Sequence, residues 1–498
     1  MAVLNREVLG LRSGAAGETS GSAVRVLQIG DGNFLRAFAD WMFDLANEAG
    51  VTNLRVTLSA ARGPGVIPQL AAQDGLFTVI SRGVLDGAAV DQRHVVRCVD
   101  EVIDPSTNWT AMLACAVKPE LRFVVSNTTE AGIAYVEEEL VHDIVPKSFP
   151  AKLAVLLWSR YQKLGPAARG LIVLPCELLE QNGAKLRRYV LQHATDWSLP
   201  PEFLAWVEQQ NHFLNTLVDR IVPGFPSADA EALQAQLGYS DAMMVAAEPF
   251  HLWVIEGPAA LEAELPLAKA GLKVLWTDDL QPFRGSKVRV LNGAHTASAL
   301  AAFGAGIDTV KGMMDDALFA RYLNTLVFDE IVPFVPLAED ERKRYAASIL
   351  ERFENPHIRH ELISISLNSV SKWQVRVLPT VKDHVRSSGK APRLLAFSLA
   401  ALLAFYHGKL DATGTYAGER NGQPYPIKDN AEVLTIMAEA WRNWQPGGDV
   451  GPLVKDLLGD ARLWGEDLSV LGDLAAQVTA ALGRIKAEGV RAALTGLL

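Results

Sequence analysis

The sequence predicts an α/β protein in which a domain built on a largely parallel sheet is followed by a mainly α-helical domain. Short apolar runs alternate with helical stretches as far as residue 280, and such alternation favours parallel strands covered by helices. After the polar residues 277–281, the pattern changes to long amphipathic stretches. These observations divide the chain into a loose leader (1–23), a sheet domain (24–280) and a helical domain (281–498).

The first region contains the runs from which the sheet is predicted. They are rich in Val, Ile and Leu and are bounded by turn-forming residues, as strands usually are. The expected strands are residues 24–30, 54–59, 77–81, 95–102, 121–126, 171–175 and 272–276, and helices are expected at 34–49, 111–117 and 151–164.

The second region is predicted to be helical because its apolar residues recur at helical spacing. Its expected helices are residues 288–303, 315–326, 340–352, 393–406, 430–444 and 468–487. The most apolar run, residues 394–406, is shorter than the roughly 20 residues that a membrane crossing needs, so we expect a buried helix. The glycine-rich segment 411–423 is expected to be a surface loop.

Composition narrows the class of function. The chain is 49% hydrophobic and 21% charged, and its net charge of −10 without a dense Lys/Arg run predicts neither a nucleic-acid nor a membrane partner. A small-molecule substrate is the better expectation. Three cysteines (Cys98, Cys115 and Cys176) without CxxC spacing, and a start that lacks the apolar segment of a signal peptide, predict a cytoplasmic protein with buried thiols.

A glycine turn follows the first expected strand. Gly30 and Gly32 are placed as in the first turn of a Rossmann-like dinucleotide-binding domain, where a helix N-terminus receives the pyrophosphate. Asn33, Phe34 and Arg36 continue the turn, and Arg36 could add a charge to the phosphate contact. The third glycine of the usual GxGxxG is replaced by leucine, so a merely structural turn stays open.

Two further segments bear on the nucleotide. The second strand ends without the Asp or Glu that usually binds the ribose hydroxyls, and Arg62 follows it, which leaves NADP(H) open beside NAD(H). Asn127, Thr128 and Glu130 follow another strand, at the sheet edge where open α/β folds bind ligands. A helix start capped by Thr128 or Thr129 is an equally compatible interpretation.

Lys287, Asn292 and His295 form the most suggestive polar group of the chain. In an α-helix, their spacings of five and three residues place them within an arc of roughly 140°. A partly buried lysine can exchange a proton near neutral pH, while an amide and an imidazole can hold the reacting oxygen. A solvated lysine, an interior amide and a core histidine are the structural alternative.

These features together resemble the polyol-specific long-chain dehydrogenase/reductase family, which includes mannitol dehydrogenase, fructuronate reductase and tagaturonate reductase. The resemblance runs from about residue 24 to near the C-terminus, and the KxxxxNxxH spacing is its most specific element. Segments 126–132, 291–296 and 365–373 resemble the tagaturonate reductase (altronate oxidoreductase) branch. This implies NAD(H)-dependent interconversion of tagaturonate and altronate by a monomer.

The resemblance also assigns roles to residues. Lys287 resembles the general acid/base of the family, and Asn292 and His295 resemble the residues that polarise and hold the reacting oxygen. Asn182 resembles a second amide of the oxyanion site. Lys372 matches a lysine of the substrate pocket.

Two positions depart from the mannitol branch. Ser364 replaces an arginine eight residues before the substrate lysine, and Arg284 replaces a glutamate three residues before the catalytic lysine. The far end of the substrate therefore need not be mannitol-like. A uronate needs a counter-charge for its carboxylate, and Lys372 and Arg284 are the candidates, with a solvated Arg284 as the alternative.

Other chemistries are less well supported. His357 and His360, with Glu361, are expected on adjacent positions of a helix, but the order HExxH is missing and no metal site is predicted. Asp383 and His384 lack a GxSxG elbow and are expected to be a surface or interdomain pair rather than part of a hydrolytic triad. Fructuronate reductase, a mannitol-type polyol dehydrogenase and a non-catalytic nucleotide sensor remain the alternatives.

Overall fold

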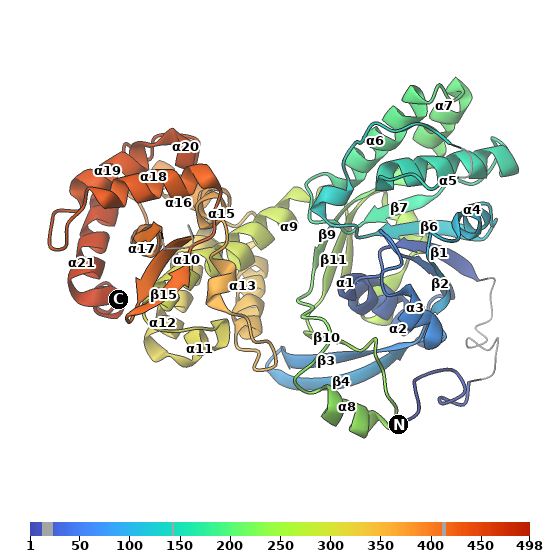
Figure 1. The fold of residues 1–498 in the computed structure, drawn as a ribbon, viewed down its shortest axis with the longest axis horizontal. Helices are drawn as coiled ribbons and strands as arrows, with labels where there is room; N and C mark the ends of the chain where they lie inside the picture. Colours follow the sequence, from blue (N-terminus) through green and yellow to red (C-terminus); the bar gives the residue numbers. More distant parts are fainter. Residues whose placement is uncertain (12–22, 142–143, 411–414) are drawn as a thin grey trace. The chain divides into compact units, whose positions relative to one another are not determined.

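The computed structural model describes residues 1–11, 23–141, 144–410 and 415–498. The chain divides into two compact units. The first comprises Met1–Gly83 and Ala88–Leu280, and the second comprises Val84–Gly87 and Gln281–Leu498. The first is built on a parallel sheet and the second is mainly helical, which confirms the predicted α/β class (Figure 1).

A six-stranded parallel sheet forms the centre of the first unit, in the order β5-β2-β1-β6-β7-β8. Its strands are β1 (Val24–Ile29), β2 (Leu54–Ser59), β5 (Val99–Ile103), β6 (Leu121–Ser126), β7 (Ile172–Pro175) and β8 (His212–Phe213). The strand order reverses between β1 and β6. Open α/β sheets bind ligands at such a point, beyond the carboxyl ends of the strands.

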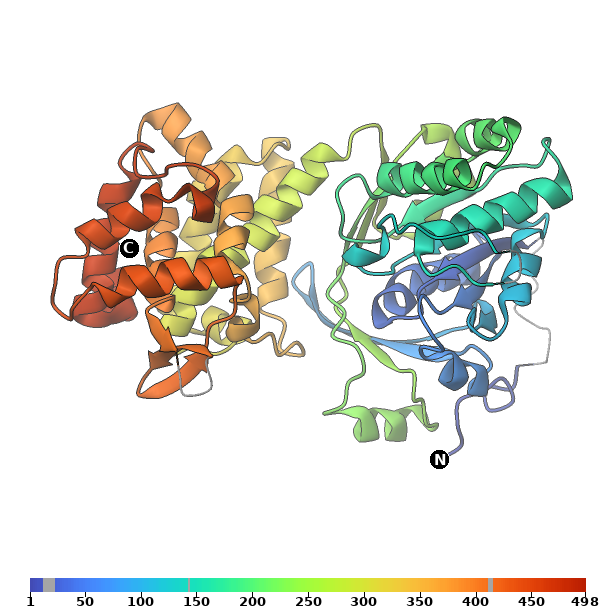
Figure 2. The ribbon, with the colours of Figure 1, turned by 45° about the horizontal axis from the view of Figure 1, so that its top comes forward.

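Helices cover both faces of this sheet. One face carries the continuous helical run of α1 (Asn33–Leu35), η1 (Arg36–Asp40) and α2 (Trp41–Glu48). The other carries α4 (Trp109–Ala116), α5 (Phe149–Leu164), α6 (Asn182–Asp196) and α7 (Pro201–Gln210), of which the last three lie together in Figure 2. Val26 packs into the first core and its neighbour Leu27 into the second. Because both faces are buried, apolar residues of β1 point to both sides of the sheet instead of to one.

Two smaller sheets complete the first unit: β10-β3-β4 and β12-β11-β9. Their strands are β3 (Phe77–Leu85), β4 (Ala88–Val96), β9 (Asn215–Asp219), β10 (Val245–Ala247), β11 (Leu252–Glu256) and β12 (Val274–Thr277). The single strand predicted at residues 95–102 is wrong, because this run contributes to β4 and β5 in different sheets. Between them, the Arg97 amide donates to the Asp44 carboxylate instead of to a strand, which the apolar pattern cannot reveal.

The second unit contains most of the helices. Its main helical segments are α9 (Gln281–Ser286), η5 (Lys287–Asn292), α10 (Gly293–Gly304), α12 (Ala317–Thr325), α13 (Glu339–Phe353), α15 (Ser369–Arg376), α16 (Leu378–Ser388), α17 (Arg393–Phe405), α18 (Ala431–Arg442), α19 (Gly451–Gly459) and α21 (Leu474–Thr495). α17 packs against α10 and α21 and is buried along nearly its whole length, as predicted. Among the described residues, no helix combines the length and the apolar character that a membrane crossing requires.

Two predictions in the second unit are wrong. The expected loop 411–423 contains strand residues: β14 (Tyr416–Arg420) pairs with β13 (Gly408–Leu410) and β15 (Gln423–Pro426), while residues 411–414 lie outside the described ones. Asn421 and Gly422, both at positive φ, make the tight turn between β14 and β15. The helix expected from residue 468 begins only at Leu474, because Gly472 at φ 54 turns the chain just before it.

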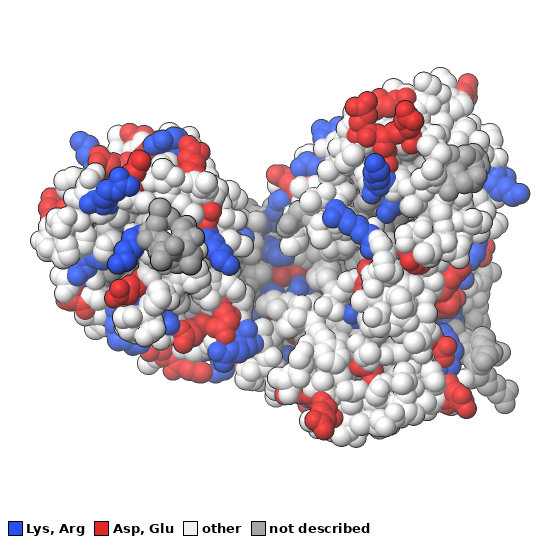
Figure 3. All heavy atoms as spheres, in the orientation of Figure 1, with Lys and Arg blue, Asp and Glu red and all other residues white. Residues whose placement is uncertain are grey.

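The remaining predictions from composition concern thiols and charge. Cys98, Cys115 and Cys176 are all buried and unpaired, which confirms that they are interior residues. On the face drawn in Figure 3, basic and acidic side chains are interspersed, so that face carries no extended basic stripe. Such a face offers no electrostatic footprint for a nucleic acid.

Candidate functional site

The glycine turn lies directly beyond the carboxyl end of β1. Gly30 has φ 125, and a Cβ there would lie 2.6 Å from the carbonyl oxygen of Asn127, so only glycine fits. Gly32 is the N-cap of the helical run, and a Cβ added to it would meet nothing within 4 Å. The helix N-terminus therefore has open space next to it, which suits a pyrophosphate bound to backbone N–H groups.

The side chains after this turn divide into outward and inward groups. Asn33 is exposed, and half-buried Phe34 stacks on Phe38 with centroids 4.9 Å apart. Arg36 is buried and donates to the carbonyls of Asp31 and Met243 and to Asn33 Oδ1, at 3.2, 2.6 and 2.6 Å. Burial lowers the pKa of Arg36 to about 10. Its guanidinium therefore holds the turn, and its contact with a phosphate stays a prediction.

The segment after β6 is held by a buried acid. Glu177 Oε1 accepts from the backbone N–H and the hydroxyl of Thr128, both at 2.9 Å, and Oε2 accepts from Ser126 Oγ at 3.1 Å. Burial raises the pKa of Glu177 against these hydrogen bonds. Sequence reasoning missed Glu177, although it follows β7 at the same sheet edge as Thr128 follows β6.

The neighbouring nucleotide candidates are placed as follows. Asn127 donates from Nδ2 to the Cys176 carbonyl at 3.0 Å. Thr129 has φ 75 and precedes a short 3-10 turn, Glu130–Gly132, without a side-chain cap, so the alternative of a capped α-helix is wrong. The Glu130 side chain lies outside the described part of the chain. The loop brings Asn127 and Thr128 to the carboxyl edge of the sheet, beside Gly30.

Asn182 is fully occupied by backbone partners. Its Nδ2 lies 2.8, 3.1 and 3.2 Å from the carbonyl oxygens of Pro175, Glu177 and Thr216. Its Oδ1 accepts from the backbone N–H groups of Gly183 and Thr216, both at 2.9 Å. The side chain is buried. This amide joins the loop after β7 to β9, and a role as an oxyanion donor stays a prediction.

Lys287 and Asn292 are the first and last residues of the π-helical segment η5, inside the continuous run α9-η5-α10. The α-helical geometry assumed in the sequence analysis is therefore wrong at this point. In a π turn, hydrogen bonds join residues five apart, so Lys287 and Asn292 lie nearly above one another on the helix surface. Their lateral separation is smaller than an α-helix would give, and such turns are frequent at functional sites.

Asn292 and His295 have unused hydrogen-bonding capacity. Within the described ranges, the half-buried Asn292 carboxamide has no hydrogen-bond partner, and the buried Nε2 of His295 has none either. His295 stacks on Phe353 and contacts His360 edge-on. Burial, assisted by His360, lowers the pKa of His295 well below its usual range. A neutral imidazole and a free amide can therefore meet a substrate oxygen on this helix face.

Lys372 lies in the same unit and has a companion that the sequence analysis missed. Lys372 Nζ donates to the Ile365 carbonyl at 3.0 Å, and Arg376, one turn further along α15, donates to Thr296 Oγ1 at 3.3 Å. Burial lowers the pKa of both. The spacing of four residues was a visible signal, because it puts both cations on one helix face. Arg284 is half-buried in α9, and its role in substrate binding stays a prediction.

The structure gives no support to the alternative metal site or to the alternative hydrolytic triad among the described residues. The segment 357–360 is not helical, so the expected helical pair of His357 and His360 is wrong. Asp383 pairs with Arg289 and Arg386, and His384 Nε2 donates to the Glu330 carbonyl at 2.7 Å, which is structural bonding rather than a triad.

One group in the described part of the chain has metal-ligand spacing: Asp44, Glu48 and His94. His94 Nε2 lies 2.8 Å from Asp44 Oδ2, and Arg97 pairs with Glu48. Both carboxylates therefore already have a side-chain partner.

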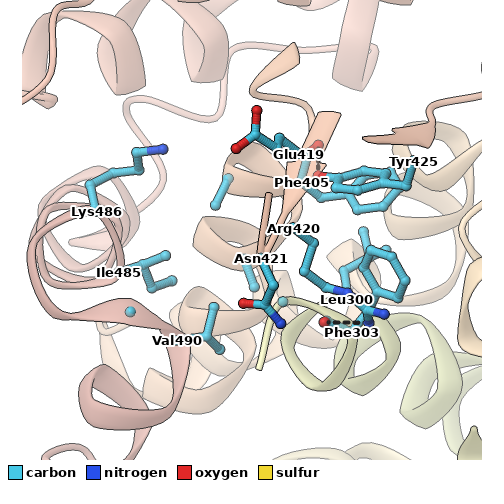
Figure 4. A pocket seen from close by; sticks show the side chains of 14 residues that line it. Leu300, Phe303, Phe405, Glu419, Arg420, Asn421, Tyr425, Ile485, Lys486 and Val490 are labelled. Atoms are coloured by element: carbon cyan, nitrogen blue, oxygen red, sulfur yellow. Dashed lines mark hydrogen bonds between the residues drawn. The ribbon is translucent and has the colours of Figure 1, made fainter. Parts of the chain in front are cut away.

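A cavity of about 240 Å³ in the second unit is not the predicted site. Figure 4 shows its wall, which includes Phe303, Phe405 and Tyr425 with Lys486 on the opposite side. None of the predicted catalytic, cofactor or substrate residues lines it.

Comparison with known proteins covers both units. The model of the mannitol dehydrogenase Rossmann domain matches residues 24–269, and that of the mannitol dehydrogenase C-terminal domain matches residues 279–486. The chain is 42% identical over 477 residues to the altronate oxidoreductase of Halalkalibacterium halodurans, covering 95% of this chain and 93% of that one. It is 43% identical over 476 residues to the altronate oxidoreductase of Klebsiella pneumoniae, covering 95% and 96%.

Solved structures show the same fold at lower identity. The mannitol 2-dehydrogenase of Pseudomonas fluorescens, in a ternary complex with NAD and D-mannitol, has a TM-score of 0.70 at 23% identity and covers 100% of this chain and 99% of that one. A substrate-free D-sorbitol dehydrogenase has a TM-score of 0.76 at 21% identity, with 99% and 100% covered.

Proposed function

The chain belongs to the mannitol dehydrogenase family, and from that premise we propose that it interconverts tagaturonate and altronate with NAD(H). It is an oxidoreductase that acts on a CH–OH group. The identity to altronate oxidoreductases along 95% of the chain is the observation that carries the choice of substrate. The buried Nε2 of His295 and the half-buried carboxamide of Asn292 have no hydrogen-bond partner among the described residues, and both lie on the helical run that contains Lys287, which supports the choice of reacting residues.

In the reductive direction, these residues act on the ketone oxygen of tagaturonate. When bound, NADH supplies the hydride that adds to the carbonyl carbon. Lys287, as ammonium, donates a proton to the oxygen, which becomes the new hydroxyl of altronate and leaves the lysine neutral. Asn292 Nδ2 and neutral His295 donate hydrogen bonds to the same oxygen while its negative charge grows. In the oxidative direction, neutral Lys287 removes that proton.

The first unit supplies the features that nucleotide binding needs. Gly32 leaves space beside the first N–H groups of the helical run, and Gly30 lets the turn pass close to Asn127. Arg62 is exposed after β2, where no carboxylate follows to favour the NAD(H) ribose. We propose NAD(H) from the likeness to the altronate oxidoreductases, and NADPH is the comparison that any assay must include.

An absorbance assay of NADH and NADPH consumption tests the proposal. Tagaturonate, fructuronate and fructose should be compared in parallel, and we expect the highest kcat/KM with tagaturonate and NADH. A preference for fructuronate or fructose would replace the proposed substrate with that of a fructuronate reductase or a mannitol-type enzyme. NADH binding without oxidation in the presence of any of these would indicate a nucleotide sensor.

Lys287→Met tests the proton donor. We expect NADH binding to be retained and turnover to fall by about 100-fold or more, the cost typical of losing a group that acts mainly in the transition state. Lys343→Met, at an exposed lysine of α13 that pairs with Glu339, is the matched control and should keep normal turnover. Near-normal rates in Lys287→Met would overturn the assignment.

We also propose that the protein is a monomer. Light scattering of the purified protein tests this by measuring its molar mass.

A further inference from the structure

We propose that Arg376, together with Lys372, binds the carboxylate of the sugar acid and so makes the enzyme selective for acids over uncharged sugars. This inference rests on the proposed function, because it concerns the far end of the same substrate. Nothing in the KxxxxNxxH pattern indicates it. Its support comes from the geometry of α15 and of the residues that this helix packs against.

The two cations share one face of α15. Lys372 and Arg376 are four residues apart, and both are half-buried. Like charges at this spacing destabilise a helix by a few tenths of a kcal/mol, and partial burial adds to that cost. A helix that keeps both cations half-buried, with no salt bridge to either from the described residues, is suited to an anion from outside the chain.

Neither cation forms an ion pair with a described residue. Across residues 1–11, 23–141, 144–410 and 415–498, the polar contact of the Arg376 guanidinium is the single one to Thr296 Oγ1. The contact of Lys372 Nζ is to a neutral carbonyl. The acid whose charge acts on Lys372 is Asp429, which also accepts a hydrogen bond from the Tyr406 hydroxyl. Four of the five guanidinium N–H groups of Arg376 therefore have no hydrogen-bond acceptor among the described residues.

The cations lie near the residues that we assign to the ketone. Thr296, which receives the Arg376 hydrogen bond, is the residue after His295 on α10. A Cβ added to Gly293 would lie 3.2 Å from the Arg376 carbonyl, so α15 passes close to the start of α10. His360 contacts the ring of His295. Burial and, to a smaller extent, the charge of Lys372 lower the pKa of His360. A six-carbon sugar held by its ketone at Asn292 and His295 would therefore have cations close by for its terminal carboxylate.

Neighbouring residues strengthen the positive character of this region. Arg352 and Arg376 both lower the pKa of His295, and burial is the largest cause of that shift. Burial also keeps His360 neutral by lowering its pKa. The region thus favours an anion while its two imidazoles stay uncharged. An uncharged sugar would gain nothing from the guanidinium fork, whereas a carboxylate can accept two parallel N–H bonds from it.

Kinetics with a matched substrate pair tests the inference. Tagatose has the same carbon chain as tagaturonate with a hydroxymethyl group in place of the carboxylate. We expect Arg376→Met to lower kcat/KM for tagaturonate about 10- to 100-fold, mainly through KM, since hydrogen bonds to a charged group contribute about 1.5–3 kcal/mol. The value for tagatose should stay within about twofold. Arg376→Lys keeps the charge but loses the fork, and should recover only part of the difference.

A control and a binding measurement complete the experiment. Arg484→Met, on the exposed face of α21, should leave both substrates unaffected. Calorimetric binding of altronate and altritol to the wild-type enzyme and to Arg376→Met gives a readout that does not depend on turnover, and melting temperatures show that each variant is folded. An equal loss for acid and neutral ligand, no loss, or weakened NADH binding alone would overturn the inference. Altronate binding that depends on Arg376, without turnover of tagaturonate, would instead refute the proposed function.

Discussion

The imidazole of His295 stacks on the ring of Phe353, with centroids 4.0 Å apart and an angle of 15° between the planes. This stack fixes the orientation of a histidine whose Nε2 is buried without a partner among the described residues. An unsatisfied buried nitrogen normally destabilises a fold by about 1–3 kcal/mol. The proposed hydrogen bond to the substrate oxygen would give this nitrogen a partner.

His295→Phe separates these two roles. The substituted ring can keep the stack on Phe353 and removes the unsatisfied nitrogen, so we expect unchanged or higher stability, by up to about 3 kcal/mol. Turnover should fall at least about 10-fold, because the oxygen of the substrate loses a donor. Thermal unfolding and initial rates measure the two effects. A variant that is less stable but fully active would show that His295 is only a core residue.

The two candidate amides should respond differently to truncation. Asn292→Ala should lower kcat by about 100-fold or more with normal stability, because its carboxamide has no partner in the described chain and is proposed to bind the substrate oxygen. Asn182→Ala removes an amide that bonds five backbone groups, so unfolding should become easier by at least about 1–3 kcal/mol. Melting temperature and kcat of both variants decide the matter. A loss of kcat without a loss of stability in Asn182→Ala would support the role of Asn182 as an oxyanion donor.

Alanine substitutions in the glycine turn distinguish space for a ligand from space needed by the chain. Gly32→Ala adds a methyl group to open space, so stability should change by less than about 1 kcal/mol while NADH affinity falls. Gly30→Ala places a methyl group 2.6 Å from the Asn127 carbonyl oxygen at φ 125, and should cost several kcal/mol, since such backbone strain alone costs about 1–3 kcal/mol. Fluorescence titration with NADH and denaturant unfolding measure both. Unchanged NADH affinity in Gly32→Ala would place the pyrophosphate elsewhere.

His251 predicts an acid-sensitive fold. It is buried in the first unit, its Nε2 accepts from the Lys273 backbone N–H at 3.1 Å, and burial lowers its pKa to about 4. In the unfolded chain the imidazole binds a proton below about pH 6.5, but the folded protein resists it until about pH 4. The stability present above pH 6.5 is therefore lost progressively as the pH falls towards 4, by up to about 3 kcal/mol.

His251→Gln checks this assignment, because an amide can accept the same hydrogen bond without titrating in this range. The decline in unfolding free energy between pH 7 and 4.5 should be smaller in the variant than in the wild type. His357→Gln, at an exposed histidine, should not alter the decline. Equal slopes in all three proteins would mean that other groups cause the acid sensitivity.

The central strands and the buried helix α17 could be predicted because burial alone accounts for their apolar sequence pattern. β2 and β6 occupy the residues expected for them, since strands covered on both faces are rich in apolar residues. The run at residues 95–102 was mispredicted because one apolar stretch serves two sheets. The hairpin at Asn421 and Gly422 had a visible turn signal, but the glycine-rich composition around it was interpreted as a loop.

By itself, the sequence determined which residue types occur at which spacing: the glycines after β1, and Lys287, Asn292 and His295 along one helical run. Only the tertiary structure decided which of these groups are left open for a ligand. In the tertiary structure, backbone groups occupy the hydrogen-bonding atoms of Asn182, and Arg36 is buried. The segment η5 is a π turn, and Arg376 donates to Thr296. The physical reason is that hydrogen-bond partners and burial come from segments distant in the chain, whereas local spacing reports only the helix or strand to which a residue belongs.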